Sequence, residues 1–197
     1  MASNTLKRWI RVVVFLCSLC MIMVLFFPIW RIELSAPQYP EGLALQIFAG
    51  KLGGDVEIIN GLNHYIGMRT LHANDFIEFT VLPYLIIFFA LLILITAIVN
   101  RNRLLYITTI LFIAFSVLAM IDFWRWEYNY GHDLNPEAAI QVPGMAYQPP
   151  LIGYKQLLNF GAFSIPDVGG WFFIAAGVLL FACTIVEWRS KKIKHVI

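Results

Sequence analysis

The chain has 197 residues, of which 60% are hydrophobic and 13% are charged, and its formal net charge is +2 at pH 7. Soluble domains are about half apolar and about a quarter charged, so this composition excludes an ordinary soluble protein. The few basic residues do not gather into one stripe, which argues against nucleic acid as a partner. Membrane lipids are the expected surroundings.

Four long apolar runs follow one another along the chain. Each has about the length that a helix needs to cross roughly 30 Å of hydrocarbon. We therefore predict an all-α integral membrane protein that forms one membrane domain over residues 1–197. Its four transmembrane helices would cover about residues 10–29, 79–99, 104–123 and 169–188. The first run ends in FFPIWR, which lacks a small-x-small cleavage site, so we interpret it as a retained helix and not as a signal peptide.

Two long loops, residues 30–78 and 124–168, separate these helices. Both are rich in apolar residues, and loops of this length are uncommon without a function. We expect them to pack together as a small cap. Within it we expect short helices around Glu41–Ala49, before Asn74-Asp75, and within residues 150–163.

The distribution of charge predicts the orientation. Basic residues dominate the amino end, the NRNR link at residues 100–103 and the carboxyl tail, whereas both loops are mainly acidic. The positive-inside rule then places both termini in the cytoplasm and both loops outside. The expected location is the inner (cytoplasmic) membrane of a bacterium, as a multi-pass protein with periplasmic loops.

The two halves of the chain share a short pattern. Trp30-Arg31-Ile32-Glu33 follows the first predicted helix, and Trp124-Arg125-Trp126-Glu127 follows the third. Each is followed by Pro-Glu and then by a Gln. This pattern suggests a two-fold internal repeat, and chance is the alternative. In both copies we expect the Glu and the preceding Arg to form an interfacial ion pair.

Histidine and methionine side chains in the loops are the candidate metal ligands. His64, Met68 and His72 are spaced four residues apart, so a helix would place them on one face. The second loop adds His132 and Met145. Imidazole and thioether ligands together suit Cu(I) better than zinc, calcium or magnesium. The alternative is that these side chains serve packing and interfacial hydrogen bonds.

Several loop strings resemble those of a known family: APQYPEGLALQI, INGLNHYIGM, FWRWEYNYGHDLNPEAAI and PPLIGYKQLLNFGAF. This is a family of small four-span bacterial membrane proteins encoded beside nitrous-oxide reductase and its copper-maturation factors. The resemblance implies a part in the maturation or support of a periplasmic copper enzyme of denitrification. The implied partners are a periplasmic copper chaperone or the apo-copper enzyme.

The sequence thus predicts a membrane accessory protein that binds Cu(I) through its outer loops. Two alternatives stay open: a non-catalytic scaffold that assembles with other membrane subunits, and a carrier of a small molecule or lipid. No catalytic constellation can be assembled from the residues, so we do not expect an enzyme.

Overall fold

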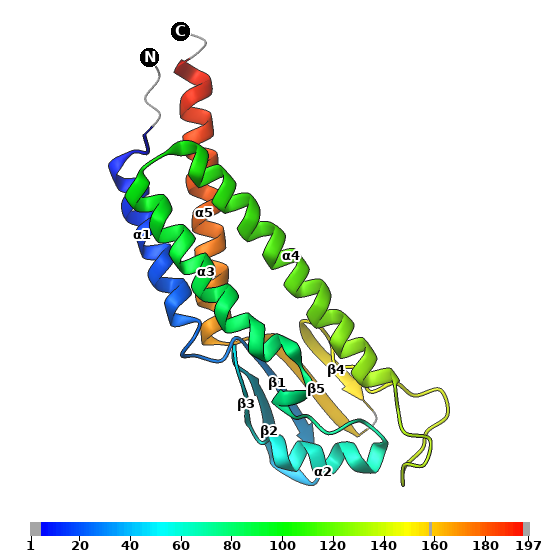
Figure 1. The fold of residues 1–197 in the computed structure, drawn as a ribbon. Helices are drawn as coiled ribbons and strands as arrows, with labels where there is room; N and C mark the ends of the chain where they lie inside the picture. The colour runs from blue at the N-terminus through cyan, green and yellow to red at the C-terminus, as the bar shows by residue number, and fades with distance from the viewer. Residues whose placement is uncertain (1–4, 158, 195–197) are drawn as a thin grey trace.

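A helical bundle with a β-sheet at one end makes up the fold (Figure 1). The computed structural model describes residues 5–157 and 159–194. Four long helices run along the molecule: α1 (Arg8–Met23), α3 (Ile77–Val99), α4 (Asn102–His132) and α5 (Val168–Lys194). The amino end of α1 and the carboxyl end of α5 lie together, at the end opposite the sheet.

Three helices in the described chain are long and apolar enough to cross a membrane, which is consistent with a membrane protein. They are α3, α4 and the first 24 residues of α5, Val168–Lys191. The helix α1 has 16 residues and at 1.5 Å per residue extends about 24 Å, less than the roughly 30 Å of a hydrocarbon core. The prediction of four spans is therefore wrong.

The bundle core is apolar. The helix α1 lies against both α3 and α5, and its Ile10, Val14 and Met21 belong to one buried cluster with Ile93 of α3 and Leu180 of α5. Many large apolar side chains of the same helices point outward and are exposed. An apolar exterior around an apolar core is the arrangement that a helix surrounded by lipid requires.

The sheet has five antiparallel strands in the order β3-β2-β1-β5-β4. The strands are β1 (Trp30–Ala36), β2 (Tyr39–Ile47), β3 (Leu52–Gly54), β4 (Gly153–Leu157) and β5 (Phe160–Pro166). The all-α fold class is thus wrong. The two stretches expected as short helices, residues 41–49 and 150–163, contribute strands instead.

The centre of the sheet joins segments that lie far apart in the sequence. The strand β1 pairs with its neighbour β2 on one side and with β5 on the other, with Ile32 opposite Ser164. Trp30 Nε1 donates a buried hydrogen bond of 2.7 Å to Ser164 Oγ across this junction. The two long loops therefore meet in one sheet.

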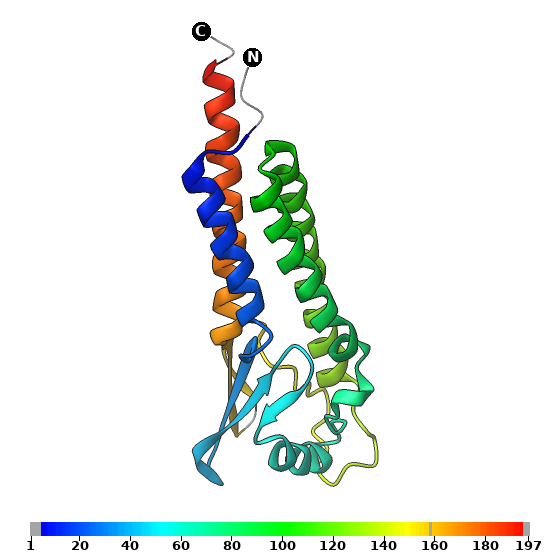
Figure 2. The ribbon, with the colours of Figure 1, turned by 60° about the vertical axis from the view of Figure 1, so that its left-hand side comes forward.

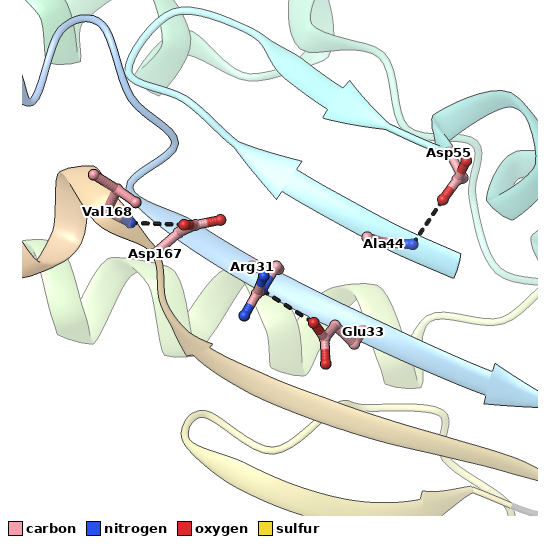
Figure 3. Close-up of polar contacts among 6 residues, drawn as sticks. All are labelled: Arg31, Glu33, Ala44, Asp55, Asp167 and Val168. Atoms are coloured by element: carbon pink, nitrogen blue, oxygen red, sulfur yellow. Dashed lines mark hydrogen bonds and ion pairs between the residues drawn. The ribbon is translucent and has the colours of Figure 1, made fainter. Parts of the chain in front are cut away.

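Alternation along β1 explains why it is a strand. Trp30 and Ile32 are buried, whereas Arg31 and Glu33 point to the other face, as the two-residue period of a strand requires. Arg31 Nε and Glu33 Oε1 lie 3.2 Å apart on that face (Figure 3). The inward side chains of β1 and β2 form a second apolar cluster.

The helix α2 (Val56–Ile66) packs against this cluster through Ile59, and the short 3-10 helix η1 (Ala73–Asp75) follows it. An aspartate stands just before each of the helices α2 and α5 (Figure 3). Asp55 Oδ2, just before α2, accepts a 2.8 Å hydrogen bond from the backbone N–H of Ala44 in β2. Asp167 Oδ1 accepts one of 2.7 Å from the N–H of Val168, where α5 begins.

The predicted internal repeat is also wrong. Residues 30–33 form part of strand β1, whereas residues 124–127 lie inside helix α4. Two segments with different backbone conformations are not copies of one structural unit.

Candidate functional site

A small apolar cavity lies between the sheet, α2 and the carboxyl end of α4. Its volume is about 90 Å³. Ile32 and Leu45 of the sheet, Leu62 of α2, Tyr130 of α4 and Tyr147 of the segment before β4 are among its walls. The cavity is therefore assembled from segments throughout the chain.

The helix α4 is longer than predicted, and its additional turns reach this cavity. It continues to His132, nine residues beyond the predicted end at Phe123. The 20 residues from Asn102 to Ile121 account for roughly 30 Å of helix, enough to cross the hydrocarbon. The last turns of α4 thus exceed the length that a span needs, and they lie beside the sheet (Figure 1).

An aromatic face on these last turns packs toward the sheet. Phe123, Trp126 and Tyr130 follow the three- and four-residue spacing of one helix face. The Phe123 and Trp126 rings stack with centroids 5.9 Å apart, and the Trp126 and Tyr130 rings stack at 5.3 Å. Glu127 lies on this same face, whereas Trp124 and Tyr128 on the other side are exposed.

The Glu127 carboxyl group is buried without a partner. The residue has 0% exposure and lines the cavity. Within the described chain, neither Oε1 nor Oε2 has a hydrogen-bond partner. Burial raises the pKa of Glu127 to about 8, because an apolar environment disfavours the charged form. A buried polar group without a partner is costly, so such groups mark strained or functional positions.

Two further polar groups at the cavity lack partners in the described structure. They are the Tyr147 hydroxyl and the Trp126 indole Nε1. The neighbouring Tyr130 hydroxyl differs, because it accepts a 3.0 Å hydrogen bond from Asn63 Nδ2 and donates to the Arg69 carbonyl. The cavity is thus bordered by buried polar groups that have no hydrogen-bond partner in the described structure.

Asn60, a buried asparagine of α2, holds the segment that forms one wall of the cavity. Asn60 Nδ2 donates to the Leu71 carbonyl at 3.1 Å, and Asn60 Oδ1 accepts from the Leu71 N–H at 2.6 Å. This two-way clamp fixes the segment after α2 against the helix. Leu71 and Met68 of that segment both line the cavity.

A second, polar cleft lies on the surface near the end of α2. His64 and Met68 line it together with Asp133, which pairs with Arg69. Gly67 permits this arrangement: it has a φ of +81°, and a Cβ there would meet the Asn135 carbonyl oxygen at 2.9 Å. The cleft therefore depends on a close approach between α2 and the segment after α4.

The predicted metal ligands are only partly brought together. His64 and Met68 share the polar cleft, and His72, His132 and Met145 are not among its lining residues. The His132 ring stacks on Tyr128, with centroids 4.0 Å apart. Searching the described residues reveals no group of three or more His, Cys, Asp or Glu side chains placed to hold a metal ion. The five-residue copper set stays a prediction.

Glu127 is the site residue that sequence reasoning missed, since it was expected to pair with Arg125. The sequence does contain a signal for it: Glu127 lies within an aromatic pattern of helical spacing, formed by Phe123, Trp126 and Tyr130. Tyr147 carries no comparable local signal.

Comparison of the chain with protein-family models, with curated proteins and with solved structures finds no match.

Proposed function

We propose that this protein is a membrane-anchored binding module that takes a small, mainly apolar molecule into the cavity beside Glu127. The observation that carries the proposal is the buried Glu127 carboxyl group without a partner at the edge of an apolar cavity. A bound molecule that hydrogen-bonds this group would offset a desolvation cost of about 1–3 kcal/mol or more. This function belongs to the class of small-molecule carriers.

The proposed orientation places the sheet outside the cytoplasm. Basic residues gather at the end of the bundle that holds both termini, and the segments that form the sheet are mainly acidic. The positive-inside rule supports a cytoplasmic position for the basic end, in a bacterial inner membrane. A membrane-impermeant thiol reagent added to intact spheroplasts should label a Ser35→Cys variant in a cysteine-free background. Labelling only after lysis would show that the protein has the opposite orientation.

A panel of small organic probes tests the binding function. Saturation-transfer NMR on the detergent-solubilised protein would report which probes bind. Leu62→Trp should fill the cavity and abolish binding, because Leu62 lines it. Ile58→Trp is the matched control, since Ile58 is exposed on the same helix. A wild-type protein that binds no probe, or a Leu62→Trp variant that binds as wild type does, would contradict the proposal.

The second candidate function is copper handling, as the resemblance implies. His64 and Met68 line one cleft, which favours it, and an imidazole with a thioether is a suitable ligand pair for Cu(I). The protein would then receive Cu(I) from, or pass it to, a periplasmic chaperone or an apo-copper enzyme.

Competition with a chromogenic Cu(I) chelator under reducing conditions tests the copper function. Cys17, Cys20 and Cys183 are free thiols, so the assay uses a variant with all three replaced by Ser. His64→Ala and Met68→Ala should each weaken Cu(I) binding at least ten-fold, and His72→Ala, outside the cleft, should not. No Cu(I) uptake, or an equal loss in His72→Ala, would reject a copper site in this cleft.

A further inference from the structure

We propose that the molecule bound in the cavity is a small organic cation, an ammonium group on a short apolar body, with Glu127 as its counter-ion. This inference rests on the binding function proposed above and names the chemical class of the ligand.

The charge of the cavity wall selects against other ligands. Glu127 is the one carboxyl group among the described lining residues, and none of those residues is Lys, Arg or His. An anion would therefore meet no positive charge and one acidic group. A neutral ligand could hydrogen-bond the protonated Glu127 carboxyl group but could not pair with its ionised form. A cation supplies the missing opposite charge, and a buried charge is tolerated only when it is paired.

The aromatic wall favours the same ligand class. Tyr130, Tyr147 and Phe160 line the cavity; Trp126 lines it too, but its ring stacks on both Phe123 and Tyr130 and offers no free face to a cation. The faces of aromatic rings attract cations, and aromatic cages are a known means of binding quaternary ammonium groups. The remaining walls are aliphatic and suit the short apolar body. An aromatic wall with one carboxyl group thus provides both parts of an organic-cation site.

No protein cation competes for Glu127 within the described structure. Arg125 lies two residues away but is exposed on another side of α4. Arg69, on the far side of the cavity wall, pairs with Asp133 at the surface. The other titratable groups facing the cavity are the phenols of Tyr130 and Tyr147; the sheet and α2 contribute none. Among the described residues, no cation pairs with the Glu127 carboxyl group, so this group can pair with a cationic ligand.

Binding requires a small movement of the carboxyl group. Its two oxygens have almost no accessible surface, so the side chain must turn toward the cavity to reach the cation. Burial raises the pKa of Glu127 to about 8, and the cation needs the charged form. Cation binding should therefore release a proton and strengthen as the pH rises toward 8.

The test compares choline with 3,3-dimethylbutan-1-ol, its uncharged isostere, which differs in having carbon in place of nitrogen. Isothermal titration calorimetry at constant ionic strength gives Kd for the detergent-solubilised full chain between pH 6 and 8.5. Choline carries a fixed charge, so any pH dependence comes from the protein. Wild type should bind choline at least ten-fold more tightly than the isostere at pH 8.5, and its Kd for choline should fall from pH 6 to 8.

Glu127→Gln and Glu33→Gln are the paired variants. Each removes one carboxylate, but Glu33 lies at the exposed ion pair on the other face of the sheet. Glu127→Gln should weaken choline binding at least ten-fold and abolish the preference for choline over the isostere, and Glu33→Gln should leave both choline binding and that preference unchanged. The wild-type comparison needs no variant, so it stands even where Glu127→Gln does not fold.

Different results overturn the ligand class and the binding function. An isostere that binds wild type as tightly as choline, or choline binding that Glu127→Gln leaves intact, would reject the organic cation and keep the binding function. The same holds when neither compound binds but other probes of the NMR panel do. Absence of binding by every probe would reject the binding function itself.

Discussion

The same four-residue pattern, Trp-Arg-x-Glu, occurs in two regions of this molecule with opposite results. In strand β1, Arg31 and Glu33 lie on one face and form an ion pair. In helix α4, Arg125 is exposed and Glu127 is fully buried. Residues two apart share a face in a strand but point in different directions on a helix. Secondary structure therefore decides whether this glutamate is solvated or buried.

One tryptophan from each pattern shows a similar difference: Trp30 in the strand and Trp126 in the helix. Trp30 of the strand is buried and donates its indole N–H to Ser164. In the helix, the half-buried Trp126 has an indole N–H without a partner in the described structure. The strand tryptophan thus has its hydrogen bond within the fold, whereas the helical region leaves polar groups without partners at a cavity in the described structure. This difference supports the proposal of a ligand site in the helical region and not in the strand region.

The largest effect is expected from the pH dependence of stability. The folded protein holds the Glu127 proton up to about pH 8, whereas the carboxyl group has an ordinary pKa of 4.5. The folded state binds more protons in this window, so the free energy of unfolding should fall as the pH rises from about 4.5 to 8. Each pKa unit corresponds to about 1.4 kcal/mol, so the loss amounts to several kcal/mol.

Glu127→Gln should remove this pH dependence and raise the melting temperature at pH 8.5. Tryptophan fluorescence during thermal unfolding in detergent measures both. Glu33→Gln serves as the control and should retain the wild-type pH dependence. Equal slopes in wild type and Glu127→Gln would show that Glu127 is not the group responsible.

A smaller effect is expected from Gly131→Ala, one helical turn beyond Glu127. A Cβ at this position would lie 2.3 Å from the backbone nitrogen of Gln148. The segment that carries Tyr147 would have to move, at a cost of about 1–3 kcal/mol for overpacking. Gly61→Ala is the control, because nothing lies within 4 Å of its Cβ position. Thermal unfolding should show loss of stability in Gly131→Ala and none in Gly61→Ala. Equal melting temperatures of the two variants would mean that the segment carrying Tyr147 does not pack against Gly131.

Substitution of each of the two tryptophans by Phe should give free energies of unfolding that differ by about 1 kcal/mol. Trp30→Phe leaves the buried Ser164 hydroxyl without its donor, whereas Trp126→Phe removes an N–H that has no partner among the described residues. Beyond the similar loss of ring area, Trp30→Phe should therefore cost about 1 kcal/mol more. Chemical denaturation of both variants measures the difference. A larger loss in Trp126→Phe would mean that its indole nitrogen is paired in solution.

The smallest effect is expected at the exposed ion pair. Arg31 and Glu33 are both partly solvated, and pairs of this kind contribute about 0–1 kcal/mol. At pH 7, Glu33→Gln should change the free energy of unfolding by about 0.5 kcal/mol or less. Repeating the denaturation in high salt checks this, because salt screens an exposed pair. A loss of several kcal/mol would indicate that the strand glutamate also has a buried role.

Much of the helical part was predictable from local sequence. The apolar runs located α3 and α5 to within a few residues at their first ends, because the length and apolarity of a spanning helix are properties of a single segment. The end of α4 was missed because its last turns carry Asp122, Arg125 and Glu127, which resemble a loop in composition. Those turns remain helical because their aromatic face packs on the sheet.

The sheet was not predicted, although β1 carries a strand signal. Trp30, Ile32 and Leu34 alternate with polar residues, which is the period of a half-buried strand. Its hydrogen-bond partners come from residues 39–47 and 160–166. A strand is stable only with neighbours, so its assignment depends on segments that local reading treats separately.

The sequence by itself determined that this chain carries long apolar helices and that charge separates its two ends, because hydropathy and charge are sums over local residues. Only the tertiary structure decided that the two outer segments form one sheet, that α1 is too short to be counted among the spans, and that Glu127 faces a cavity. Those outcomes depend on contacts between residues far apart in the chain. The same Trp-Arg-x-Glu pattern therefore yields an exposed ion pair in one place and a buried carboxyl group in the other.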